Sequence, residues 1–306
     1  MGAGVGKNVT AKSQRVIERE VRRYLKTGEF DIMFSAWPGR NIIEKAQNGD
    51  SDLRAALIVE VHAREGGREF PVPPTEVDPV SFARSKVAPM INGLFPQKER
   101  ETVLGLLEKS LVFLHRDNID QVLQEERWLS TVWDLANIYL TSIGAEPLGQ
   151  KRAHIVGLSR DTTCYVSMTY FDEDDPFADF VVHEAAHIFH NWKREYAGLP
   201  HTRRRQWLLP IDFSKRETFA YSCEAYSRVL ERAETRADRW RLLQEYAEEW
   251  VPESDDRVDW DELLDILSET VEARNGWKRI LSRCAPPKPK SRAEILRNLM
   301  KPSGQI

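Results

Sequence analysis

The feature that most constrains this chain is a pair of histidines four positions apart, in the stretch His183-Glu184-Ala185-Ala186-His187. On an α-helix, a step of four residues advances about 6 Å along the axis and slightly more than one turn, so both imidazoles leave one face. The apolar runs Phe180–Val182 and Ile188-Phe189 enclose the pair, as a buried helix requires. The spacing therefore predicts half of a metal site on a buried helix, with Glu184 about a quarter-turn aside.

Composition narrows the class of protein. The 306-residue chain is 41 % hydrophobic and 30 % charged, as in ordinary globular proteins, and its formal net charge of −4 gives no electrostatic reason to expect nucleic acid as a partner. The sequence has no apolar run that approaches a membrane span, and its N-terminus has no basic-then-apolar signal. We expect a cytoplasmic protein, because three cysteines without metal-type spacing favour a reducing compartment: Cys164, Cys223 and Cys284.

Hydrophobic periodicity divides the chain into a helical region over residues 1–150, a core over 151–252 and a helical cap over 253–306. The stretch Pro71-Val72-Pro73-Pro74 interrupts the first region and predicts an ordered loop there. The helices predicted on either side of the core, together with one at its end, are Ala11–Lys26, Asp78–Asn92, Lys98–His115, Glu126–Ile143, Asp238–Trp250, Asp259–Arg274 and Arg292–Met300.

The hydrophobic period changes within the core. Ile, Val, Thr and Tyr are concentrated in Ala153–Leu158 and Cys164–Tyr170, which predicts two short strands. Acidic residues and Pro176 then start a helix from Phe177 to about Glu195, and a second helix runs from near Lys215 to Arg232. We therefore expect a mainly helical α+β fold with a small sheet, an active-site helix and a second ligand-bearing helix.

A metal held by His183 and His187 needs a third protein ligand, because catalytic zinc takes three and leaves a fourth position for water. The second helix offers two carboxylates, Glu217 and Glu224, which are seven residues apart and therefore share one helical face about 10 Å from each other. Only one of them can contact the metal. The spacing by itself leaves the choice open.

These residues resemble the gluzincin-type zinc metallopeptidases, in which a ligating glutamate follows the histidine motif on a later helix. The resemblance extends over about Ala153–Leu230 and implies a zincin-like core; the chain is also similar to uncharacterised bacterial proteins with this motif. Glu217-Thr218-Phe219-Ala220 looks like the glutamate-x-x-alanine motif of several members, which implies Glu217 as the third ligand of one Zn²⁺ ion per chain. Tyr221 stands where the thermolysin-like branch has an aspartate, so Glu224 either holds a histidine ring or is itself the ligand.

The metzincin pattern is excluded, since it requires a glycine and a third histidine where this chain has His190 and Lys193. His190 lies on the helix face of His183, but about 10 Å further along the axis. That distance is too long for three ligands from one straight helix to surround a metal. We expect His190 to hold a ligand ring or to lie at the surface.

The expected reaction is hydrolysis of a peptide bond in a peptide or protein substrate. Zinc would lower the pKa of its water, and Glu184 would take the proton and pass it to the leaving amine. Cys164–Tyr170 is either the edge strand on which the substrate lies, as the resemblance implies, or an ordinary core strand. The alternatives are a non-catalytic protein whose metal staples helices and a helical protein with a chance motif. The candidate oxyanion donors, by residue type, are Tyr221, Tyr226 and His201.

Three further motifs have simpler interpretations. Gly2–Asn8 resembles a phosphate loop but follows no strand and lacks a required glycine, which favours a flexible terminus. Asp172–Asp175 lacks the spacing of a calcium loop and is typical of a solvated helix start. Arg203-Arg204-Arg205 either binds a substrate carboxylate or, as we expect, forms a solvated or salt-bridged loop.

Overall fold

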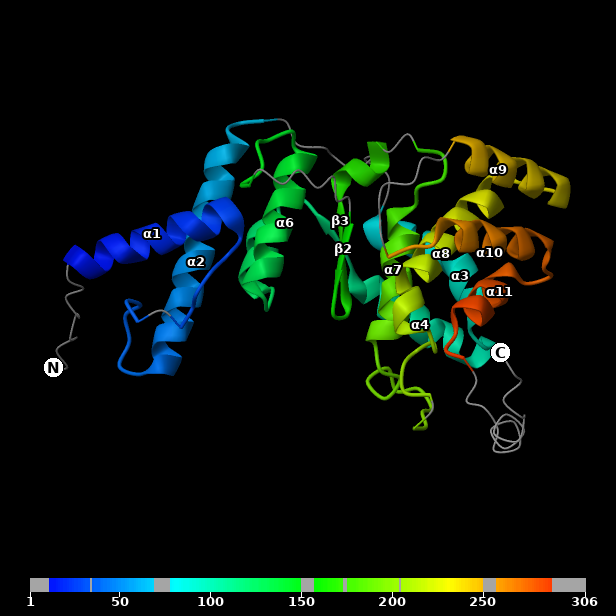
Figure 1. Cartoon of the computed structure of the whole chain (residues 1–306), viewed down its shortest axis with the longest axis horizontal. Coiled ribbons are helices and arrows are strands. Elements are labelled where there is room, and N and C mark those ends of the chain that lie inside the picture. Colours follow the sequence, from blue (N-terminus) through cyan, green and yellow to red (C-terminus); the bar gives the residue numbers. More distant parts are fainter. Residues whose placement is uncertain are drawn as a thin grey trace, which may run out of the picture.

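The computed structural model describes residues 11–33, 35–68, 78–149, 157–172, 175–203, 205–249 and 257–287. This part of the chain is mainly helical with one small sheet, which confirms the expected α+β class (Figure 1). The helices are α1 Ala11–Thr27, α2 Ile42–Glu65, α3 Pro79–Leu94, α4 Gln97–Ser110, α5 Ile119–Glu125, α6 Leu129–Ser142, α7 Phe180–Asn191, α8 Arg216–Arg232, α9 Arg236–Glu249, α10 Trp260–Glu272 and α11 Gly276–Cys284. The strands are β1 Leu111–Leu114, β2 Gly157–Arg160 and β3 Thr163–Ser167.

Several predictions fall outside the described residues. These are the Gly2–Asn8 terminus, the loop at Pro71–Pro74, most of the Ala153–Leu158 strand and the helix Arg292–Met300. The boundaries predicted near residues 150 and 252 lie in undescribed stretches as well. The division into three parts therefore stays a prediction.

The sheet has the order β1-β3-β2. β1 runs parallel to β3, with Leu111 opposite Cys164, and β2 runs antiparallel to β3, with Ser159 opposite Cys164. The tight connection between β2 and β3 places Asp161 at a φ of 51°, a left-handed conformation that a short polar residue tolerates. The hairpin and the distant β1 therefore form one sheet with β3 at its centre.

Of the two alternatives for Cys164–Tyr170, an edge strand or a core strand, the sheet order excludes the edge strand. β3 lies between β1 and β2, so both of its hydrogen-bonding edges are occupied, and the alternative of a core strand is the correct one. The strand also ends at Ser167, because Met168–Asp172 turns into a 3₁₀-helix. In the described sheet, β2 is the edge strand that lies beside α7.

The prediction of one helix over Lys98–His115 is also wrong at its end. α4 stops at Ser110 and Leu111–Leu114 forms β1, so the region before residue 150 is not purely helical. A run of four apolar residues fits either a buried helix or a buried strand. Pairing with β3, which buries Phe113 and Leu114, decides for the strand.

Two hydrophobic clusters lie on opposite faces of the sheet (Figure 1). One joins α3, α4, α7, α8, α9, α10 and α11, and receives Cys164 and Val166 from β3. The other joins α1, α2, α5 and α6, and receives Tyr165. Successive side chains of a strand point to opposite faces of the sheet, so β3 alone contributes to both clusters. The sheet therefore separates the two clusters, and each cluster is the core of one lobe.

The histidine-bearing helix α7 begins later than the sequence predicts. Asp179 caps it by accepting a hydrogen bond from the Val182 backbone N–H, and the chain before Phe180 is a turn rather than the predicted first helical turn. Ala185 and Ala186 are fully buried, which allows α7 to pack closely on its neighbours. α7 contacts α8 on one side and both β2 and β3 on the other.

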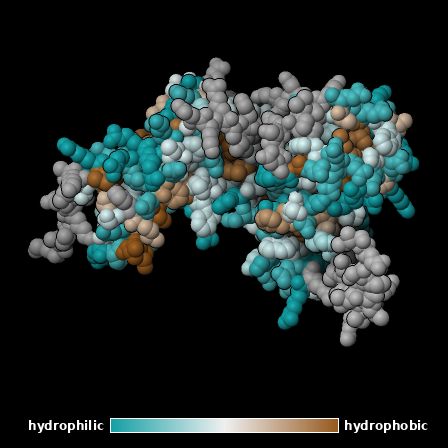
Figure 2. Space-filling model, viewed as in Figure 1, coloured by the Kyte–Doolittle hydropathy of each residue, from teal (hydrophilic) through white to brown (hydrophobic). Residues whose placement is uncertain are grey.

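The surface is largely hydrophilic on the face drawn in Figure 2, and its outline is indented between the two lobes. Among the described helices, none combines the length and the apolar character that crossing a bilayer requires. The cytoplasmic location stays a prediction.

Candidate metal centre

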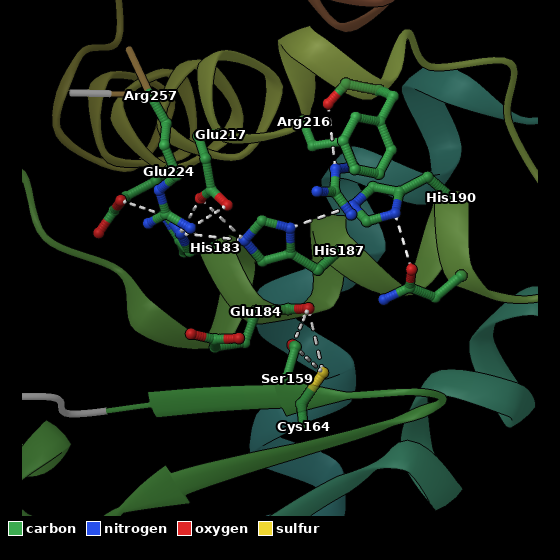
Figure 3. Close-up of polar contacts among 12 residues, drawn as sticks. Ser159, Cys164, His183, Glu184, His187, His190, Arg216, Glu217, Glu224 and Arg257 are labelled. Atoms are coloured by element: carbon green, nitrogen blue, oxygen red, sulfur yellow. Dashed lines mark hydrogen bonds and ion pairs between the residues drawn. The ribbon is translucent and has the colours of Figure 1, made fainter. Parts of the chain in front are cut away.

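α7 and α8 bring three donor atoms together (Figure 3). His183 and His187 lie one turn apart on α7, with their Nε2 atoms 3.3 Å from each other. Glu217, in the first turn of α8, places Oε2 3.4 Å from Nε2 of His187 and 3.9 Å from Nε2 of His183. The three donor atoms all lie within 4.8 Å of one another. We call these three residues the His-His-Glu cluster.

The His-His-Glu cluster has the composition and the spacing to hold a metal ion. Tetrahedral coordination with bonds of about 2.0–2.1 Å sets neighbouring ligand atoms about 3.3 Å apart, close to the separations in this cluster. Two imidazole nitrogens and one carboxylate oxygen suit several divalent transition metals. The geometry therefore fits a metal without fixing which one.

Glu224 lies behind the ring of His183 rather than in the cluster. Its Oε2 accepts a hydrogen bond from Nδ1 of His183 at 2.9 Å, and its Oε1 accepts one from the backbone N–H of Asp179 at 2.8 Å. With Nδ1 donating to Glu224, Nε2 is the atom of His183 that faces the cluster and can bind a metal once it is deprotonated. Of the two carboxylates that the sequence offered, the structure places Glu217 in the cluster and Glu224 in this supporting position.

His190 supports His187 in a similar way. Nδ1 of His187 is 3.1 Å from Nε2 of His190, and Nδ1 of His190 is 2.9 Å from Oδ1 of Asn191. Because the Asn191 oxygen accepts, His190 carries its proton on Nδ1, and its Nε2 accepts from His187. Burial, followed by the electrostatic influence of His187 and Arg216, lowers the pKa of His190 to about 4, so this ring is neutral at physiological pH.

The charges around His183 favour its protonated form in the metal-free protein. Burial lowers the pKa of His183, but the hydrogen bond to Glu224 and the nearby carboxylates Glu184 and Glu217 together raise it to about 9. Burial likewise opposes ionisation of Glu217, but the hydrogen bond from His187 and the charge of Arg257 outweigh it and hold the pKa of Glu217 below its usual value. The donors thus form a set that attracts a cation.

Glu184 is buried beside the cluster with one carboxylate oxygen unsatisfied. Its Oε2 has no hydrogen-bond partner within the described part of the chain, and the residue is only 8 % exposed. A buried, unpaired carboxylate oxygen is costly, and such groups are concentrated at functional sites. The backbone C=O of Glu184 is held separately by donors from Ser159 and Cys164, at 3.0 Å each.

Gly157 makes room for the Glu184 side chain, and the sequence analysis missed it. A Cβ atom at this position would lie 2.8 Å from Cγ of Glu184 and 3.1 Å from its Oε1. Gly157 is the first residue of β2, the strand that adjoins α7. A lone glycine within a strand gives no signal of this role in the sequence, because the close approach is created by a helix that follows about 20 residues later.

The three candidate oxyanion donors lie in different places. Tyr221 is one turn beyond Glu217 on α8, and its ring meets the ring of His183 edge-on with centroids 4.5 Å apart. Tyr226 lies about two and a half turns beyond Glu217, on the opposite face of α8, where it packs against Trp277. His201 lines a cavity in the loop after α7. Within the described part, Tyr221 is the one of the three that contacts a residue of the His-His-Glu cluster.

Arg257 is a further residue that the sequence analysis missed. It precedes α10, and its Nη1 donates to Oε1 of Glu217 at 2.8 Å, which leaves Oε2 directed at the histidines (Figure 3). The side chain of Arg257 is 68 % exposed. Nothing in the local sequence links it to α8, since the contact arises from the packing of α10 on α8.

Comparison with known proteins adds no relative: no family model, no curated protein and no solved structure matches this chain. The gluzincin resemblance therefore rests on the motif residues alone. The functional interpretation rests on the geometry of the His-His-Glu cluster and the buried Glu184 beside it.

Proposed function

We propose that this protein is a zinc-dependent peptidase in which His183, His187 and Glu217 hold the metal and Glu184 is the general base and acid. The observation that carries the proposal is the His-His-Glu cluster, with three donor atoms within 4.8 Å, next to a buried carboxylate whose Oε2 is unpartnered. Two histidines and one glutamate are a ligand set of catalytic zinc in hydrolases. We interpret α7, α8 and the adjoining sheet as a zincin-like core.

The bound metal would supply a water of lowered pKa and polarise the scissile carbonyl. Glu184, buried and adjacent to the cluster, takes the proton of the attacking water and delivers it to the leaving amine. Glu224 and His190 each hold a ligand ring by its Nδ1 proton, so both Nε2 atoms point to the metal. Tyr221, whose ring lies against His183, is the donor we assign to the oxyanion.

The edge strand β2 gives the substrate a place to lie. It begins at Gly157, directly beside the Glu184 side chain, and in the described sheet it pairs on one side only. An extended peptide that adds to its open edge would carry its backbone past the His-His-Glu cluster. This role was predicted for Cys164–Tyr170, and the sheet order transfers it to β2.

Metal content tests the ligand assignment. Elemental mass spectrometry of the purified protein should find roughly one zinc per chain, and Glu217→Gln should lose most of it. Glu224→Gln should weaken zinc binding by about 10- to 100-fold without abolishing it, because it loosens a ligand ring. Glu248→Gln, at an exposed position of α9, is the control that should keep the metal. A wild-type protein that takes up no zinc after reconstitution would exclude the metal site.

Turnover tests the role of Glu184. The zinc-loaded protein should cleave members of a peptide library, and Glu184→Gln should keep its zinc and lose activity by about 10²- to 10⁴-fold. If the metal only holds the helices together, Glu184→Gln should keep both its zinc and its fold, and neither the wild type nor the variant should cleave peptides. Zinc binding without cleavage, in both the wild type and Glu184→Gln, would favour that structural alternative.

A further inference from the structure

The loop that follows α7 is rich in cations. We call residues 193–207, of which 204 is not described, the basic loop. It lines a cavity of about 210 Å³, formed by Lys193, Glu195, His201, Thr202, Arg203 and Gln206. Two permanent cations and one carboxylate face this cavity, and the carboxylate of Glu195 is 3.8 Å from the ammonium of Lys193. The cavity therefore has an excess of positive charge together with neutral donors.

Two arginines of this region are not neutralised by a carboxylate. Within the described residues, neither Arg203 nor Arg216 forms an ion pair, whereas Arg205 of the same loop pairs with Glu99 at 3.2 Å. The sequence analysis expects a solvated or salt-bridged loop at Arg203–Arg205, and this ion pair confirms the salt bridge for Arg205 only. Arg203 instead lines the cavity. Of these two arginines, Arg205 therefore has a structural ion pair, whereas the guanidinium of Arg203 is available to bind an anion.

Arg216 is held in a fixed orientation at one end of the metal cluster. Its Nε donates to the backbone carbonyl of Phe213 at 3.1 Å, and its guanidinium carbon is 3.7 Å from the centroid of the Phe213 ring. Phe213 is 77 % exposed, so this stacked pair lies at the surface. Figure 3 shows Arg216 beside His190, in the last turn of α7. The Nη groups are therefore available beside the cluster.

Exposed aromatic rings accompany the cations of the basic loop. Tyr196 and Trp207 are 71 % and 41 % exposed, and the ammonium of Lys193 is 5.7 Å and 6.0 Å from their ring centroids. α7 ends at Asn191, about 6 Å along the helix axis from His187, and Lys193 follows two residues later, outside the helix. The basic loop therefore begins within about two to four residues of an extended peptide from His187.

We propose that the basic loop and Arg216 bind the carboxylates of an acidic peptide segment, about two to four residues from the bond that lies at the His-His-Glu cluster. This inference rests on the proposed function, since it specifies the substrate class of the same site. Guanidinium groups bind carboxylates in a bidentate manner, and the exposed rings offer apolar contact to the intervening side chains. The carboxylates belong either to Asp and Glu side chains or to the C-terminus of the peptide.

The experiment measures binding without turnover. Zinc-loaded and zinc-free Glu184→Gln protein is titrated against two fluorescein-labelled peptides that differ only in Glu against Gln, each with a free or an amidated C-terminus. The acidic peptide should bind about 10-fold more tightly than its Gln twin, and the difference should shrink as salt rises from about 0.05 to about 0.5 M. A preference that follows the C-terminus instead assigns the subsite to a terminal carboxylate.

Three arginine variants test the location. Arg203→Gln and Arg216→Gln should each weaken binding of the acidic peptide by about 3- to 10-fold and leave the Gln twin unchanged. Arg241→Gln is the control, because Arg241 is 67 % exposed on α9 and pairs with Asp238. Equal binding of the twin peptides, an equal loss in Arg241→Gln, or tighter binding of a single-stranded oligonucleotide of equal charge would overturn the proposal.

The outcomes separate this inference from the proposed function. Cleavage of peptides without any preference for carboxylates would leave the peptidase assignment intact and remove the acidic subsite. Arginine-dependent binding of acidic peptides to a protein that cleaves none of them would leave the subsite intact and remove the peptidase assignment.

Discussion

Three glutamates in and beside the His-His-Glu cluster differ in their hydrogen-bond and ion-pair partners. Glu217 divides its oxygens between the histidines and Arg257, and Glu224 divides its oxygens between His183 and the start of α7. Oε2 of Glu184 has no partner among the described residues. At the scale of the residue, the roles we propose for them, as ligand, ring support and proton carrier, therefore follow from hydrogen bonding rather than from residue type.

Gly157→Ala should reduce peptide hydrolysis by about 10- to 100-fold, because the new Cβ would displace the Glu184 carboxylate and small misplacements of a catalytic group have costs of this size. Metal content should stay at the wild-type level, since the ligands are untouched. The measurements are kcat/KM on a cleaved peptide and elemental analysis. Wild-type activity in this variant would show that Glu184 tolerates the shift or is not the base.

At the scale of the element, one contact between two helices depends on a glycine. Gly93 of α3 lies against Trp277 of α11, and a Cβ at Gly93 would come within 2.1 Å of the Trp277 ring. Gly105 of α4 has no atom within 4 Å of its hypothetical Cβ. The two glycines have the same intrinsic cost in a helix, so the packing of α11 on α3 is what separates them.

Gly93→Ala should destabilise the protein by about 1–3 kcal/mol, because it overpacks the contact between α3 and α11. Gly105→Ala should stabilise it by about 0.5–1 kcal/mol, since alanine is the better helix former where space is free. Urea unfolding of both variants checks the pair. Equal effects of the two substitutions would contradict the close contact.

His62 links α2 to α5 and makes stability depend on pH. The hydrogen bond to Glu65 raises its pKa above the ordinary 6.5, against the opposing effect of burial, and Asp120 adds a contact at 2.9 Å. A raised pKa in the folded state contributes stability that is complete below about pH 6.5 and is lost as the pH rises through the folded value. The partly exposed pair contributes less than about 1 kcal/mol.

The difference in unfolding free energy between wild type and His62→Gln should therefore be larger at about pH 5.5 than at about pH 8.5. His115→Gln is the matched control, because the nearest carboxylate to His115, that of Asp117, is 3.9 Å away. Urea unfolding at both pH values measures the difference. If the difference in unfolding free energy between wild type and His62→Gln grows with pH, the sign assigned to the His62 contribution is wrong.

At the scale of the whole molecule, a buried ion pair ties the basic loop to α4. Arg194 is fully buried, and its Nη2 lies 2.8 Å from Oε1 of Glu99, in the geometry of an ion pair rather than of an aligned hydrogen bond. Arg194 also donates to the carbonyls of Pro200 and Leu208. The loop that follows the histidine-bearing helix α7 is thereby anchored to α4, in the first half of the chain.

Glu99→Gln should destabilise the protein by about 3–5 kcal/mol, because it leaves the charge of Arg194 buried without a counter-charge. Glu101→Gln on the same helix should change stability by less than about 1 kcal/mol, since Glu101 is 80 % exposed and pairs with Arg84 at the surface. Thermal or urea unfolding distinguishes the two variants. A small effect at Glu99 would show that Arg194 reaches solvent.

The mainly helical α+β class follows from hydrophobic periodicity, and the shared face of His183 and His187 follows from their four-residue spacing on a helix. The same local rules assign Leu111–Leu114 to a helix, and they leave open whether Cys164–Tyr170 is an edge or a core strand. A short apolar run acquires a strand conformation, and a strand acquires its place in a sheet, only through partners distant in the sequence.

The sequence by itself determined which residues are chemically able to bind a metal, because helical spacing is a local property. It left Glu217 and Glu224 equivalent on one face of α8. Only the tertiary structure decided between them, since the angle and offset of α8 on α7 bring Glu217 to the cluster and Glu224 to the back of His183. Gly157 and Arg257 acquire their places for the same reason, as both contacts join elements far apart along the chain.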